Sequence, residues 1–303
     1  MKRRAVVIVN AGSGTGSDAD PVERLGPLFE AVGLEVEIVV VHGDELSARI
    51  HAAVEARPAI VVAGGGDGTV SSVAAALVDT GLVLGVLPLG TLNHFAKDLG
   101  IPLDLEDAVR CLAEGEPQAV DVGEVNGRVF INNSSLGLYP DIVRDRERQQ
   151  KRLGRGKWPA LVWATLASLR RYAFLGVRLR IDGNERLFRT PFVFIGNNEY
   201  RMEGFAIGER AALDGAQLSL YVAQRPGRLR LLQLAVRALF GRLRQARDFD
   251  AVLASEIEVE SRHLHLRVAT DGEVTVMAPP LRYRIRPASL RVMRPRATPP
   301  APG

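Results

Sequence analysis

The chain has 303 residues, 47% of them hydrophobic, so it can bury a large core and exceeds the usual size of one domain. Its single cysteine, Cys111, excludes an internal disulfide and a thiolate metal cluster and favours a reducing compartment such as the cytoplasm. The formal net charge of +4 comes mainly from arginine and suits an anionic lipid, a phosphate or a nucleic acid.

The chain opens on an apolar run, residues 5–9, that ends at Asn10 and a glycine-rich turn. This pattern is typical of a first β-strand rather than of a secretory signal. No run approaches the roughly 18 to 20 apolar residues that cross a bilayer. We therefore expect a cytoplasmic protein that meets a membrane only peripherally, on its inner face.

Up to about residue 121, β-branched runs alternate with helical stretches, which predicts a parallel sheet covered by helices. The expected strands are 5–9, 35–41, 59–63 and 83–87, and the expected helices are 21–32, 45–57, 71–78 and 105–115. Residues 1–121 are thus predicted to form a doubly wound α/β domain.

Beyond residue 121 the pattern changes to short alternating runs, which predicts an antiparallel β domain over 122–293. Whether its last segment returns to the first domain stays open. Two helical inserts are expected at 157–172 and 228–247, and the Pro-rich tail 294–303 is expected to be disordered.

The most informative loop follows the predicted strand 59–63, where four glycines surround Asp67 and precede Thr69. Glycine lets backbone N–H groups approach a phosphate closely, and the following helix adds its positive N-terminal end. Asp67 fits a site that holds Mg²⁺ or positions a hydroxyl. The alternative is a tight strand-to-helix turn with an Asp cap.

Two further glycine-containing loops favour a phosphate site over a simple strand-to-helix turn. Residues 10–16 (NAGSGTG) follow the first predicted strand, and residues 87–93 (LPLGTLN) follow the fourth. Loops after successive strands of a doubly wound sheet gather at its carboxyl edge, where ligands bind. Neither the Walker A pattern nor a complete dinucleotide glycine pattern is present.

Four motifs together resemble the diacylglycerol kinase catalytic-domain family, which is related to the sphingosine kinases. They are residues 10–14 (NAGSG), 65–69 (GGDGT), 88–93 (PLGTLN) and 271–273 (DGE), supported by 130–133 (FINN) and 196–198 (GNN). The GGDGT motif alone is shared with NAD kinases, whereas the complete set is more specific. The resemblance covers roughly residues 5 to 290.

The resemblance implies an α/β nucleotide-binding lobe and a β-sandwich lobe for the lipid substrate, with the active site in the cleft between them. It implies a kinase that uses ATP with Mg²⁺ to phosphorylate a primary hydroxyl of a diacylglycerol-like or sphingoid-like lipid at an anionic membrane surface. The residues expected to bind the nucleotide are Asn10, Gly12, Ser13, Gly14, Thr15, Gly64, Gly65, Gly66, Asp67, Gly68, Thr69, Gly90, Thr91 and Asn93.

By the same resemblance, Glu273, or the Asp271/Glu273 pair, takes the proton from the lipid hydroxyl, and Asp67 supports the metal or the nucleotide. On local sequence alone, the turn of a β-hairpin is the better-supported interpretation of residues 271–273, because Asp-Gly is a favoured hairpin turn.

The chain departs from the family pattern at two positions. His94 stands where the family commonly has an acid, and it contacts a phosphate, acts as a weak base or has only a structural role at the helix start. Asp214 stands alone where many relatives have two adjacent acids in a region associated with a structural Mg²⁺. We expect Asp214 to be the residue of any metal site there.

Two Arg-rich amphipathic segments, 144–172 and 228–247, could lie on an anionic bilayer or pack on their own domain. Both tryptophans of the chain lie in the first segment. The alternatives to a lipid kinase are a soluble-substrate kinase of the NAD-kinase type and a catalytically weak nucleotide or lipid sensor. A nucleic-acid partner is not expected, because it does not explain the phosphate-type loops, and the oligomeric state stays open.

Overall fold

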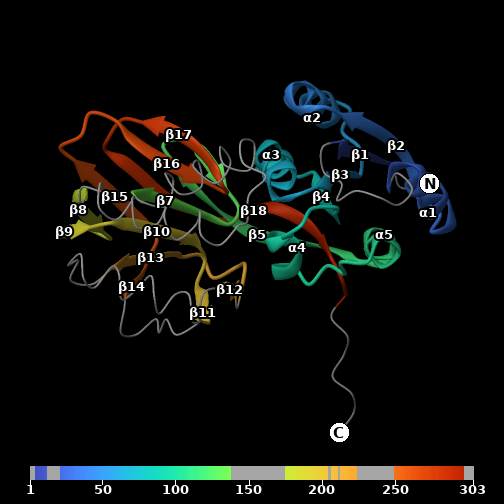
Figure 1. The fold of residues 1–303 in the computed structure, drawn as a ribbon. Helices are drawn as coiled ribbons and strands as arrows, with labels where there is room; N and C mark the ends of the chain where they lie inside the picture. Colours follow the sequence, from blue (N-terminus) through green and yellow to red (C-terminus); the bar gives the residue numbers. More distant parts are fainter. Residues whose placement is uncertain are drawn as a thin grey trace, which may run out of the picture. The chain divides into compact units, whose positions relative to one another are not determined.

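In the computed structural model, residues 4–11, 21–137, 175–203, 206–210, 212–223 and 249–296 are described. The chain divides into two compact units, 1–122 with 287–303, and 123–286 (Figure 1). The strands β5 (Glu116–Val125) and β18 (Leu281–Arg294) contribute residues to both units.

The first unit is built on a parallel sheet in the order β2-β1-β3-β4. Its strands are β1 (Arg4–Asn10), β2 (Glu35–Val41), β3 (Ile60–Gly65) and β4 (Val83–Pro88). β3 and β4 are buried along their whole length, as expected for inner strands covered by helices. The end of β18 continues this sheet, where Arg291 lies in parallel register with Val83.

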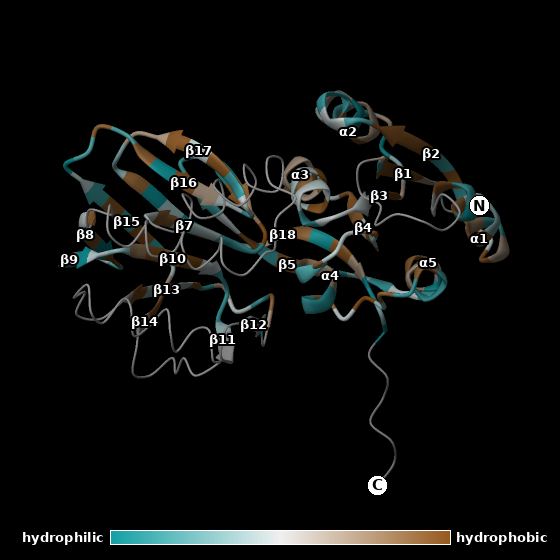
Figure 2. Cartoon of the chain, in the orientation of Figure 1, coloured by the Kyte–Doolittle hydropathy of each residue, from teal (hydrophilic) through white to brown (hydrophobic). Residues whose placement is uncertain are grey.

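The helices of this unit show the apolar stripe that packing on a sheet requires, and α5 combines hydrophobic and hydrophilic faces in Figure 2. They are α1 (Pro21–Ala31), the 3₁₀ turn η1 (Gly43–Glu45), α2 (Leu46–Glu55), α3 (Asp67–Leu77), α4 (His94–Asp98) and α5 (Leu105–Glu114). The side chain of Asp104 caps α5 by accepting from the backbone N–H groups of Glu106 and Asp107.

Helix α3 begins at Asp67, four residues before the start that the sequence predicts. The backbone of Gly66 is still extended, and the chain enters the helix directly after it. Gly and Asp have low helix propensity, which is why the sequence places them in a loop. An acidic residue in the first turn is nevertheless favourable beside the positive end of the helix.

The second unit is an antiparallel β-sandwich. One layer has the order β14-β13-β10-β7-β16-β17. Its strands are β7 (Asn133–Gly137), β10 (Phe192–Asn197), β13 (Leu218–Ala223), β14 (Phe249–Ala254), β16 (Leu266–Thr270) and β17 (Glu273–Met277). The predicted fold class, an α/β unit followed by an antiparallel β-sandwich, is confirmed.

The other layer contains β8 and β9 together with β15 and the first part of β18. These strands and the remaining ones are β6 (Arg128–Phe130), β8 (Leu175–Ile181), β9 (Asn184–Thr190), β11 (Tyr200–Glu203), β12 (Ala206–Arg210) and β15 (Glu256–Ser261). β8 shows why the layers pack: its apolar residues are buried and alternate with exposed Arg178 and Arg180. The core between the layers includes Leu136, Val193, Val268 and Leu281.

The end of the described chain is ordered through Arg294, the residue at which the sequence places the start of the tail. Its guanidinium donates from Nε to the carbonyl of Leu99 and from Nη1 to Gln118. Residues 297–303 and both predicted inserts, 157–172 and 228–247, lie outside the described residues. Among the helices that are described, none is long and apolar enough to cross a membrane.

Candidate active site

Three of the predicted phosphate loops begin at the same edge of the parallel sheet. β1, β3 and β4 are neighbours, and they end at Asn10, Gly65 and Pro88. Val9 lies in register with Gly64, and Gly65 with Pro88. β2 and β3 flank β1 on opposite sides, so the loops after β1 and β3 border the point where the strand order reverses, which is where such sheets bind ligands.

A hydrogen bond joins the ends of β1 and α3 across this point. The side-chain amide of Asn10 donates to Thr69 Oγ1 at 3.3 Å, and Thr69 is buried. A Cβ at Gly65 would lie 2.7 Å from the same hydroxyl oxygen. Glycine at 65 therefore allows the threonine side chain to pack against the end of β3.

The loop after β4 approaches the loop after β3 just as closely. A Cβ at Gly90 would lie 2.4 Å from the Cα of Gly66. Asn93 fixes this loop, because its amide donates to the carbonyls of Pro88 and Gly90 and its Oδ1 accepts from the Gly90 N–H. Asn93 also adopts a left-handed conformation, φ 52°, that asparagine tolerates well.

Asp67 links the two loops. It is half-buried in the first turn of α3, and its Oδ1 accepts from the backbone N–H of Phe95 at 3.4 Å. Asp67 therefore caps the start of α4 and not its own helix, so the strand-to-helix turn is present without the Asp cap considered from sequence. The same carboxylate lies among glycine-rich backbone at the sheet edge.

The other residues of this group differ in exposure. Gly64 is buried, whereas Gly68, Thr91 and His94 are exposed. Gly12, Ser13, Gly14 and Thr15 lie outside the described residues.

In the second unit, Asp271 and Glu273 belong to the hairpin that joins β16 and β17. Asp271 and Gly272 both have positive φ, 48° and 89°, as in a type I′ turn. The hairpin that the sequence offers as an alternative to catalysis is thus present, and it carries both carboxylates at its end.

Asp271 is held by the chain segment before β7. Its Oδ2 accepts from the N–H of Ile131 at 2.8 Å, and its Oδ1 accepts from the N–H groups of Asn132 at 2.8 Å and Asn133 at 3.1 Å. The Asp271 N–H donates to the carbonyl of Asn133. The FINN motif therefore acts through its backbone.

Glu273 has a different environment. Its side chain is 60% exposed, and Oε2 accepts from Arg128 Nη2 at 2.5 Å. Arg128 also donates from Nε to Thr270 Oγ1 at 2.8 Å. The sequence gives no sign of this arginine, because it lies 145 positions from Glu273 in the chain.

A buried arginine, Arg210, holds the segment 131–132 that in turn binds Asp271. Arg210 is 6% exposed and donates to the Ile131 carbonyl at 2.6 Å and to Asn132 Oδ1 at 3.0 Å. Its guanidinium lies over the ring of Tyr200, whose hydroxyl donates to the Asn132 carbonyl. The sequence gives no sign of Arg210, because it comes from the separate β11–β12 hairpin.

Comparison with known proteins identifies the family. The family model for the diacylglycerol kinase catalytic domain matches residues 4–125, and the model for the YegS C-terminal NAD kinase beta sandwich-like domain matches residues 142–294. A protein named "Probable lipid kinase YegS-like" from Chromohalobacter salexigens is 33% identical over 224 residues, which cover 72% of this chain and 71% of that protein. The chain belongs to the diacylglycerol kinase catalytic-domain family.

A second relative and a solved structure are also similar to this chain. A "Probable lipid kinase YegS-like" from Klebsiella pneumoniae is 37% identical over 144 residues, 46% of this chain and 48% of that one. A solved structure of a diacylglycerol kinase from Bacillus anthracis str. Sterne has a TM-score of 0.72 at 22% identity, over 97% of this chain and 98% of that chain. At this identity the structural likeness shows the fold.

In this family member the metal prediction at Asp214 stays a prediction. Asp214 is exposed, and the neighbouring Gly215 lies against the side-chain oxygen of Asn198. Within the described residues, no group of three or more His, Cys, Asp or Glu side chains could hold a metal ion by itself. A magnesium ion that arrives with nucleotide phosphates needs only one or two protein carboxylates, and Asp67 fits that requirement.

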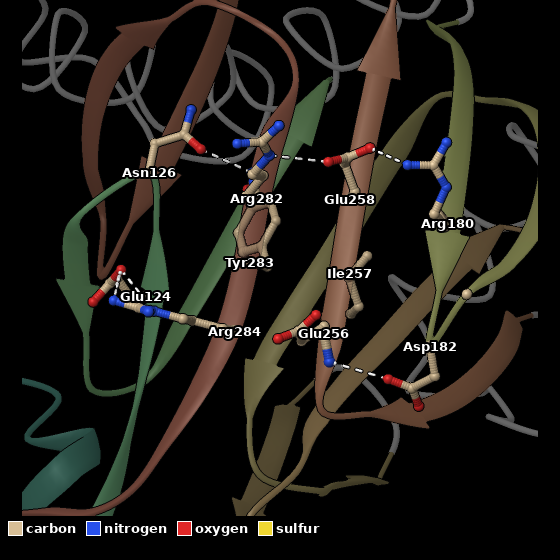
Figure 3. A pocket seen from close by; sticks show the side chains of 11 residues that line it. Glu124, Asn126, Arg180, Asp182, Glu256, Ile257, Glu258, Arg282, Tyr283 and Arg284 are labelled. Atoms are coloured by element: carbon tan, nitrogen blue, oxygen red, sulfur yellow. Dashed lines mark hydrogen bonds and ion pairs between the residues drawn. The ribbon is translucent and has the colours of Figure 1, made fainter.

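A pocket of about 640 Å³ on the second unit is separate from these motifs (Figure 3). Arg180 and Arg282 reach Glu258 from either side, and Arg284 pairs with Glu124. Each arginine of the pocket is therefore paired with a carboxylate that also lines it, and Asp182 and Glu256 add two further acidic residues to the lining. This arrangement offers little attraction to a phosphate, so the family's chemistry is not expected there.

Proposed function

We propose that this chain is an ATP-dependent lipid kinase that transfers the γ-phosphate to a primary hydroxyl of a membrane lipid. The observation that carries the proposal is that β1, β3 and β4, each followed by glycine-containing sequence, end at one edge of the parallel sheet, with Asp67 in the first turn of α3. Backbone N–H groups and a helix N-terminus are suited to bind the phosphates of a nucleotide.

On this proposal, the triphosphate binds to Gly64–Thr69 and to the loop that Asn93 fixes. Asn10 supports the first of these loops by its hydrogen bond to Thr69. Gly12–Thr15 complete the phosphate site. Asp67 would help to hold Mg²⁺, which when bound would neutralise charge on the transferred group.

The lipid hydroxyl is the nucleophile. Its oxygen forms a bond to the γ-phosphorus while the bond from that phosphorus to the leaving ADP oxygen breaks. The hydroxyl proton passes to the carboxylate of Glu273, which is exposed and can accept it. A diacylglycerol-like or a sphingoid-like lipid satisfies this chemistry.

The test is transfer of labelled γ-phosphate from ATP and Mg²⁺ to a mixed lipid extract. Wild-type protein should produce a labelled lipid, and Asp67→Ala and Glu273→Ala should each lower the rate by at least about 100-fold, as expected for loss of general-base or charge-stabilising groups. Glu256→Ala, which removes an exposed carboxylate of β15, is the matched control and should keep the wild-type rate.

The second candidate is a sensor that binds nucleotide or lipid with little turnover. It is favoured by exposed His94, which stands at the start of α4 in place of the acid common in the family. ATP binding without any labelled lipid would support the sensor. Label transferred to NAD added to the same assay, with none in lipid, would support the NAD-kinase type of activity and overturn the lipid proposal.

A further inference from the structure

The two carboxylates of the β16–β17 hairpin differ in how much hydrogen-bonding capacity they have left. Both oxygens of Asp271 accept backbone N–H groups of the described segment 131–133, with donor–acceptor distances of 2.8 to 3.1 Å. A carboxylate that receives a proton becomes a weaker acceptor, so protonation of Asp271 would weaken the contacts that hold the hairpin to the segment before β7. Asp271 is therefore suited to fix the hairpin.

Glu273 retains a free acceptor. Its Oε2 is occupied by Arg128, whereas its Oε1 makes no hydrogen bond to any described residue. With 60% of the side chain exposed, Glu273 can meet a hydroxyl from outside the unit. An exposed glutamate nevertheless has many rotamers, and a general base needs one orientation.

Arg128 supplies that orientation. Its guanidinium is tied at Nε to the hydroxyl of Thr270, which is buried, and reaches Oε2 of Glu273 from Nη2. The planar guanidinium fixes the angle between these two bonds, which a lysine ammonium cannot do. Thr270 is the last residue of β16, in the same hairpin as Glu273. Arg128 therefore holds the Glu273 carboxylate at a defined position relative to β16.

We propose that Arg128 is a positioning residue that aims Glu273 at the acceptor hydroxyl, while Asp271 holds the hairpin and does not take the proton. This inference rests on the proposed lipid-kinase function. An ion pair as exposed as this one, 37% and 60%, contributes little to folding. Loss of Arg128 should therefore appear in turnover and not in stability.

The experiment measures kcat and KM for ATP and lipid, with unfolding midpoints, for Arg128→Gln, Arg128→Lys, Glu273→Gln and the double variant Arg128→Gln with Glu273→Gln. Arg128→Gln should lower kcat by about 10- to 100-fold, the cost of a misplaced catalytic group, with KM for ATP within about 2-fold. Arg128→Lys should recover part of the loss. In the Glu273→Gln background, Arg128→Gln should cause no further loss.

Arg180→Gln is the matched control, because Arg180 pairs with Glu258 at 2.7 Å in the same unit but away from the hairpin. It should leave kcat unchanged. Asp271→Asn should lower the unfolding midpoint, yet the molecules that remain folded should turn over within about 10-fold of wild type, far above Glu273→Gln.

The outcomes separate this inference from the function on which it rests. If wild-type protein labels no lipid, the proposed function fails. If wild-type protein is active but Arg128→Gln keeps its kcat, or the losses of Arg128→Gln and Glu273→Gln multiply, the positioning role is wrong. A folded Asp271→Asn that is as inactive as Glu273→Gln would assign the proton transfer to Asp271.

Discussion

Gly66 and Gly90 show how single residues set the geometry of the phosphate edge. With a Cβ at Gly90 only 2.4 Å from the backbone of Gly66, the loops after β3 and β4 could not keep their present separation. The position has no positive φ, so its requirement for glycine comes from space alone. A glycine needed for close approach of two loops is a feature that sequence alone does not distinguish from a flexible one.

Gly90→Ala should therefore force the two loops apart. We expect a loss of about 1 to 3 kcal/mol in unfolding free energy, typical of overpacking, together with weaker ATP binding. Urea unfolding and nucleotide titration measure both. Gly26→Ala is the control: a Cβ there meets nothing within 4 Å, and the helical position should gain about 0.5 to 1 kcal/mol. Equal effects of the two substitutions would contradict the steric argument.

At the scale of elements, the two layers of the sandwich are joined by a buried polar contact as well as by apolar packing. Tyr283 of β18 lies in the core, and its hydroxyl lies 3.1 Å from Ser134 Oγ of β7. Its ring meets Phe130 edge-on. Burial raises the pKa of the Tyr283 phenol above its ordinary value, so the folded protein holds it neutral.

Alkaline pH should weaken the protein through this residue. In the unfolded chain the phenol ionises above about pH 10, whereas the folded state retains the proton, so the stabilisation by Tyr283 is complete below that pH and is lost as pH rises beyond it. Tyr283→Phe should cost about 1 to 3 kcal/mol at pH 7, since Ser134 loses its buried partner. Unfolding midpoints from pH 7 to 11 should show this difference shrink above pH 10. A difference that is constant with pH would contradict the assignment.

At the scale of the whole molecule, the net charge of +4 matters for how a lipid kinase reaches its substrate. The described residues include no helix able to cross a membrane, and the two Arg-rich segments lie outside them. Membrane-surface access through those segments stays a prediction from the sequence. Attraction of this kind depends on salt, because the Debye length is about 10 Å at 0.1 M.

Wild-type protein should co-sediment with vesicles that contain anionic lipid, lose most of that binding in about 0.5 M salt, and bind neutral vesicles weakly. Arg230→Glu with Arg237→Glu should reduce binding strongly. The control Arg49→Glu with Arg291→Glu changes the net charge equally at exposed positions of the first unit and should reduce it less. Equal loss in both double variants would mean that overall charge, not the segment 228–247, drives binding.

Local periodicity and turn residues close together in the chain were enough to predict the α/β unit, the antiparallel β unit and the three loops at the carboxyl edge, whereas the packing of the antiparallel strands as a sandwich was implied by the family resemblance. The sequence also predicted the hairpin at Asp271. The contacts that hold Asp271 and Glu273 follow from the tertiary structure, since Arg128 and the segment 131–133 lie 138 to 145 positions away in the chain. Such pairings leave no local pattern, because they arise when distant strands pack into one sandwich.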